Sequence, residues 1–94
     1  MDRRRVRVDF NEMVENDLVL LAKGDDVTDS AGEPIRLAEG LLIHIYEEDP
    51  GENGELEALI ADGTVERNVT GGWTSAAKWN CRIDARGIRR WPQG

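Results

Sequence analysis

The chain has 94 residues, which is enough for one folded domain and too few for two of ordinary size. With one cysteine and one histidine, it can form neither an intramolecular disulfide nor a zinc site with four cysteine or histidine ligands. The longest apolar run, Leu18–Ala22, is too short to span a membrane, and the basic N-terminus lacks the apolar stretch of a signal peptide. We therefore expect a single domain over residues 1–94, soluble and cytoplasmic.

The net charge of −7 is distributed unevenly along the chain. Residues 1–8 carry +3, residues 9–66 carry −15 and residues 67–94 carry +5, which together give −7. The basic ends either lie against the acidic centre of their own chain or form a patch for an anionic partner. We favour the first interpretation, because the acidic centre supplies partners for the arginines within the same molecule.

Short apolar segments separated by Gly, Pro, Asn and Asp predict an all-β domain. The first segment, residues 5–10, alternates so that its valines and Phe10 would face a core and Arg5, Arg7 and Asp9 would face water. The predicted strands, in chain order, are residues 5–10, 18–22, 35–37, 41–48, 56–68, 78–84 and 88–91, and a further short extended piece opens at Val27. They predict a small antiparallel barrel of five to seven strands.

Two local features leave the strand pattern open. Phe10, Met13, Val14 and Leu18 follow the spacing of a helical stripe, so residues 11–17 fit either a short helical turn or a loop. Gly63 interrupts the predicted strand 56–68, where it indicates a bulge or a bend.

One stretch resembles a known family of small barrels. The residues Val19–Val27, which contain Lys23-Gly24-Asp25, are similar to the Leu-x-Phe-x-Lys-Gly-Asp-x-Ile stretch of Src-homology-3 domains. Asp9-Phe10 stands where such domains carry Asp-Tyr or Asp-Phe. The resemblance implies a Src-homology-3-like barrel. It does not extend to polyproline binding, because the paired tryptophans and the Pro-Ser-Asn-Tyr segment of the family are missing.

The residue types that carry chemistry are scarce. Cys81 alternates with Trp79 and Ile83, which predicts a buried, inert thiol. His44 lies within an expected strand and is predicted to be half-exposed. The acidic residues do not match a calcium-binding loop, and no nucleophile elbow, phosphate loop or dinucleotide fingerprint is present. We therefore predict no enzyme activity, no cofactor and no metal.

The predicted role is a protein-interaction or accessory module whose partner is another protein. Exposed tryptophans are typical interface anchors, so Trp73 and Trp91 are candidate contact residues. The alternative is a nucleic-acid-binding accessory protein, in which the arginines of both ends converge beside a tryptophan. Its candidate residues near the C-terminus are Arg82, Arg86, Arg89 and Arg90, and those near the N-terminus are Arg3, Arg4, Arg5 and Arg7.

Overall fold

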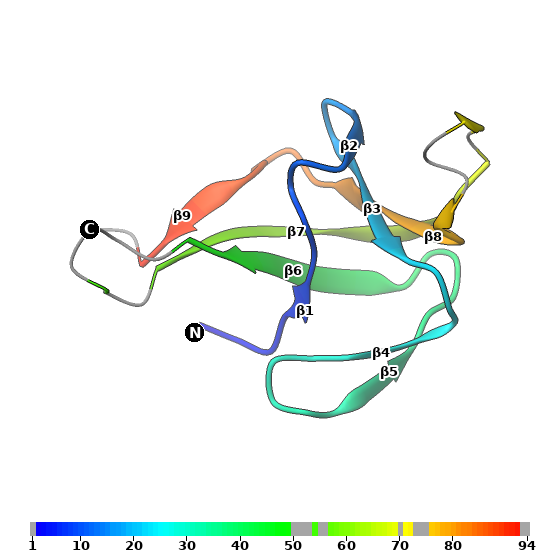
Figure 1. Ribbon diagram of the computed structural model, residues 1–94. Coiled ribbons are helices and arrows are strands. Elements are labelled where there is room, and N and C mark those ends of the chain that lie inside the picture. The colour runs from blue at the N-terminus through cyan, green and yellow to red at the C-terminus, as the bar shows by residue number, and fades with distance from the viewer. Residues whose placement is uncertain (1, 50–53, 55–56, 70, 73–75, 93–94) are drawn as a thin grey trace.

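A computed structural model describes residues 2–49, 54, 57–69, 71–72 and 76–92. This part of the chain contains strands and no α-helix, which confirms the all-β prediction (Figure 1). The strands are β1 (Val6–Arg7), β2 (Met13–Glu15), β3 (Leu18–Ala22), β4 (Asp26–Thr28), β5 (Pro34–Arg36), β6 (Leu42–Glu48), β7 (Ala58–Arg67), β8 (Trp79–Ile83) and β9 (Arg89–Trp91). None of the described residues belongs to a helix long and apolar enough to cross a membrane.

The strands form one large sheet and a separate hairpin. The order in the sheet is β1-β6-β7-β8-β3-β2, with β9 paired to the first residues of β7, while β4 pairs with β5. The described residues form more strands than the predicted five to seven. The extended piece expected from Val27 is confirmed as part of β4, whereas β2 lies where the sequence suggested a helical turn or a loop. The prediction of a purely antiparallel sheet is wrong at one edge, where β1 runs parallel to β6.

The large sheet is not closed into a barrel. Its two ends are β1 and β2, and these strands are not paired with each other in the part of the chain that the structure describes. The segment after β1 leads directly from one end of the sheet to the other (Figure 1). Because β1 and β2 have only two and three residues, neither provides a ladder long enough to seal the opening.

The helical turn considered for residues 11–17 is absent, and β2 lies there instead. Met13 pairs with Val19 and Glu15 with Leu18, with an irregular register between the two pairs. Phe10 is buried in the core, and Met13 packs against it from this irregular strand. Side chains that reach one core across a turn and a bulge can reproduce helical spacing without a helix, which explains the misleading pattern.

The core follows the predicted alternation in most places. It is formed by Val6, Val8, Phe10, Val19, Leu37, Ile43, Ile45, Ala61, Val65, Trp79, Cys81 and Ile83. The burial predicted for Trp79, Cys81 and Ile83 on one face of β8 is confirmed. Asn80, between them, is also buried, because its Nδ2 donates a 3.2 Å hydrogen bond to Oδ1 of Asn68 on the other face.

Gly63 lies inside the continuous strand β7, opposite Ile43 of β6 and Ile83 of β8. A Cβ atom at this position would stand 2.2 Å from the carbonyl oxygen of Arg82 and 2.8 Å from Sγ of Cys81. The glycine therefore marks a close approach of two backbones, and the register of β7 with β6 and β8 continues through it without the bulge that the sequence suggested.

Candidate functional site

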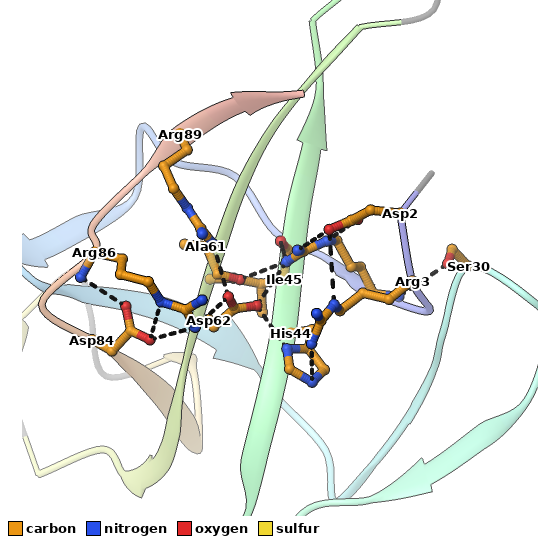
Figure 2. Close-up of polar contacts among 11 residues, drawn as sticks. Asp2, Arg3, Ser30, His44, Ile45, Ala61, Asp62, Asp84, Arg86 and Arg89 are labelled. Atoms are coloured by element: carbon orange, nitrogen blue, oxygen red, sulfur yellow. Dashed lines mark hydrogen bonds and ion pairs between the residues drawn. The ribbon is translucent and has the colours of Figure 1, made fainter. Parts of the chain in front are cut away.

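Asp62 is a buried carboxylate at the centre of a polar network on the sheet. It lies in β7 opposite His44 of β6, and only 5% of its surface is exposed. Its Oδ1 atom accepts a 2.9 Å hydrogen bond from Nη1 of Arg5 and lies 2.6 Å from Nδ1 of His44 (Figure 2). Because a carboxylate only accepts hydrogen bonds, the Nδ1 atom of His44 carries the proton in this pair.

The second oxygen of Asp62 binds two arginines from the C-terminal part of the chain. Its Oδ2 atom accepts hydrogen bonds from Nη2 of Arg86 at 2.8 Å and from Nη2 of Arg89 at 2.7 Å. Arg86 is also held by Asp84, in a turn that ends at Gly87 with a φ of 68°. We call Asp62, Arg5, His44, Arg86 and Arg89 the Asp62 network.

The charges of this network keep Asp62 ionised. Burial by itself would raise the pKa of Asp62, but hydrogen bonds from His44 and Arg89 and the charge of Arg5 lower it well below the ordinary range of an aspartate. The network therefore stabilises the fold most strongly when its central group is a carboxylate.

Arg5 is the most buried charged residue, with 1% of its surface exposed. Its Nε and Nη2 atoms donate to the two carboxylate oxygens of Asp2 at 2.9 and 2.8 Å, and Nη1 donates to Asp62 and to the carbonyl oxygens of Ile45 and Ala61. The prediction that Arg5 faces water is wrong. Strand β1 begins only at Val6, so the alternation of that strand does not govern the direction of the preceding side chain.

The other arginines of the C-terminal segment lie outside the Asp62 network. Arg82 forms ion pairs with Glu15, Asp17 and Glu66 at 2.6, 2.8 and 3.1 Å. Arg90 forms ion pairs at 2.9 Å with Asp49 and with Glu57. The structure therefore brings Arg86 and Arg89 to the carboxylate that Arg5 also binds, and Nη1 of Arg3 lies 3.4 Å from Nε2 of His44 in the same network. Arg82 and Arg90 pair elsewhere, and each of the four C-terminal arginines meets acids of its own chain.

The tryptophans divide between core and surface. Trp79 is buried, and its Nε1 donates a 3.0 Å hydrogen bond to Asp25. Trp91 is half-buried in β9, opposite Ala58 of β7. Trp73, the other predicted anchor, lies outside the residues that the structure describes.

The thiol of Cys81 is fully buried, as the sequence predicts. Burial raises the pKa of Cys81 to about 12, and the charges of Asp62, Asp84 and Glu66 act in the same direction. We expect a thiol reagent such as 5,5′-dithiobis(2-nitrobenzoate) to label the native protein slowly and the urea-unfolded protein rapidly, because only a thiolate in contact with solvent reacts. Equal rates in both states would contradict the burial of this side chain.

A groove of about 910 Å³ opens between the two ends of the sheet. One wall comes from β1 and the segment that follows it, and the other comes from β3 and the residues just before β8. The apolar lining residues are Val8, Leu20, Leu21, Ala22, Ala76 and Ala77. The groove therefore occupies the opening at which the sheet does not close.

Charged side chains surround this apolar lining. They are the acidic Asp9, Glu12 and Glu47 and the basic Arg7 and Lys23. Arg7 and Lys23 make no ion pair with any residue that the structure describes, unlike the arginines around Asp62. The groove is thus the place where apolar surface and uncompensated charge occur together.

The described residues contain no group of three histidine, cysteine, aspartate or glutamate side chains placed to hold a metal ion.

Neither Asp62 nor the groove was identified as a candidate site from the sequence. A signal for Asp62 exists, since this charged residue directly follows the apolar run Leu59-Ile60-Ala61 within one predicted strand, and a charge in a strand of that kind indicates a buried partner. No family model, no curated protein and no solved structure matches the chain.

Proposed function

We propose that the protein is a non-enzymatic interaction module and that the groove binds a peptide segment of a partner protein. The observation that carries this proposal is the groove itself, which joins an apolar lining to charged side chains that form no ion pair with a described residue. Its volume of about 910 Å³ is within the range of about 300–1,000 Å³ that is common for ligand-binding sites.

The groove is a better candidate than the Asp62 network. Binding an anion at Arg86 or Arg89 would compete with Asp62, whose oxygens those arginines already hold at 2.8 and 2.7 Å. Arg7 and Lys23 have no such intrachain contact to lose. A partner at the groove also covers Leu21 and Ala22, which are half-buried and gain from removal of water.

The resemblance to Src-homology-3 domains supports an interaction role. The similar stretch, Val19–Val27, includes Leu20–Lys23, which line the groove. A Src-homology-3-like relationship is part of the proposal, whereas polyproline recognition is not. The buried thiol of Cys81 fits the reducing, cytoplasmic compartment that we also propose.

A displayed library of random peptides, selected on the folded protein, tests this proposal. We expect selected peptides to shift the nuclear magnetic resonance signals of Val8, Leu21 and Ala22. The variant Leu21→Arg should lose binding, because a long charged side chain fills the groove. Leu42→Arg is the matched control, since Leu42 is an exposed leucine outside the groove.

Failure to select any peptide, or binding unaffected by Leu21→Arg, would contradict the proposal.

The nucleic-acid alternative has its own observation, because Arg3 and Arg86 have half or more of their side chains exposed beside the Asp62 network. Fluorescence anisotropy with labelled single-stranded DNA and RNA at low salt tests it. Micromolar binding that weakens steeply with salt and is lost in Arg86→Gln would favour that alternative.

A further inference from the structure

Two carboxyl groups lie together on the wall of the groove. The backbone N–H of Val8 donates a 2.9 Å hydrogen bond to the carbonyl oxygen of Tyr46, which continues the parallel pairing of β1 with β6. This pairing brings Asp9 beside Glu47, and both side chains line the groove. We call them the groove carboxyl pair.

The groove carboxyl pair has no cation of its own. Neither carboxylate forms an ion pair with a residue that the structure describes, although Arg7 and Lys23 line the same groove. Glu47 is half-buried, and burial raises its pKa, as do the charges of Asp9 and Asp49 and a side-chain hydrogen bond with Asp9, whereas a hydrogen bond with the backbone of Phe10 lowers it. The negative charge of the exposed Asp9 therefore opposes the ionisation of half-buried Glu47.

A cation from outside would relieve this repulsion. Its attraction to a half-buried carboxylate exceeds its attraction to a fully exposed one, because the effective dielectric constant is lower there. An anion would meet three acidic side chains, Asp9, Glu12 and Glu47, on the lining of the groove. Three acidic side chains thus outnumber the two basic ones, Arg7 and Lys23, on the lining, and the excess favours a positively charged group.

We infer that the partner's peptide segment places a lysine or arginine side chain against Asp9 and Glu47 and an apolar side chain over Leu21 and Ala22. This inference rests on the proposed function and specifies the partner's chemistry. The apolar contact anchors the segment, whereas the basic side chain sets its orientation and excludes acidic sequences. Arg7 and Lys23 are exposed on the rim, where charges contribute little to affinity.

The selected peptides provide the first test. We expect each to contain a lysine or arginine beside an apolar residue, and replacement of that basic residue by methionine should weaken binding to the wild-type protein about tenfold. Glu47→Gln should weaken binding of the original peptide by a similar factor. Glu48→Gln, an exposed neighbour in β6 outside the groove, is the matched control and should leave binding unchanged.

A double-mutant cycle distinguishes direct contact from an indirect effect. If the peptide's basic side chain touches Glu47, the methionine peptide should bind wild-type protein and Glu47→Gln with equal affinity. Additive losses would overturn the inference, as would selected peptides that bind in the groove without a basic residue. Both of those results leave the proposed function standing. Absence of any binding at the groove would overturn the proposed function together with this inference.

Discussion

Replacement of Asp62 by alanine is expected to lower the free energy of unfolding by about 3–5 kcal/mol, because it removes one of the two carboxylates that pair with buried Arg5. Arg5 is 1% exposed and cannot turn to water without disrupting β1. Arg86 and Arg89 lose the same acceptor. Small domains have a total stability of only about 5–15 kcal/mol, so this single change consumes a large part of it.

Urea unfolding followed by circular dichroism measures this effect. Asp84→Asn is the matched control, because Asp84 pairs with Arg86 on the surface and an asparagine can still accept the hydrogen bond from the backbone N–H of Arg86. An exposed pair contributes about 0–1 kcal/mol. Equal losses in the two variants would show that the Asp62 network does not stabilise the fold beyond a surface ion pair.

The stability difference between the wild type and Asp62→Ala is expected to depend on pH, and the pKa of Asp62 gives the sign. The pKa of Asp62 in the folded protein lies well below its value in the unfolded chain. Its contribution to stability is therefore fully present above the unfolded pKa of about 4 and is lost as the pH falls toward the folded value. We expect the stability difference between wild type and Asp62→Ala to shrink on acidification below about pH 4.

Gly63→Ala is the second change with a large expected effect. The added Cβ would lie 2.2 Å from a backbone oxygen of β8, and neither strand can move without disturbing the ladders on both sides of β7. We expect a loss of about 2 kcal/mol or more, in the range of severe overpacking. The measurement is again the midpoint of urea unfolding.

Gly24→Ala is the matched control for Gly63→Ala. No atom lies within 4 Å of a Cβ built at Gly24, and its backbone is outside the left-handed region. Its stability should change by less than about 1 kcal/mol. A Gly63→Ala variant as stable as Gly24→Ala would mean that β7 and β8 are farther apart at this point than the structure shows.

The strands could be predicted where apolar residues alternate with polar ones, as in 41–48 and 78–84, or form a short continuous run, as in 18–22. These segments each contain or nearly match a strand of the structure, β6, β8 and β3. The local pattern suffices there because the buried face of each strand is decided by its own side chains. It fails for β2, whose irregular register mixes apolar residues from a turn and a ladder.

The Asp62 network could not be predicted in the same way. Arg5 and Asp62 are 57 positions apart, and the alternation of residues 5–10 assigns Arg5 to the solvent-facing side of a strand. Only the position of Asp62 directly after an apolar run, within a predicted strand, gives a local sign of burial. The groove gives none, since its two walls come from opposite ends of the sheet and exist only because the sheet remains open.

The docking of Arg5 also constrains the order in which the molecule assembles. Its contacts with Ile45 and Asp62 span 40 and 57 positions, whereas β6 and β7 are joined by a short connection and close at a smaller cost in chain entropy. Arg5 and its acceptor Asp2 are synthesised before Ile45, Ala61 and Asp62, so the N-terminal segment cannot dock until those acceptors have been made. We therefore expect the segment to join a β6–β7 hairpin that has already formed, which makes the burial of this arginine a late step of folding.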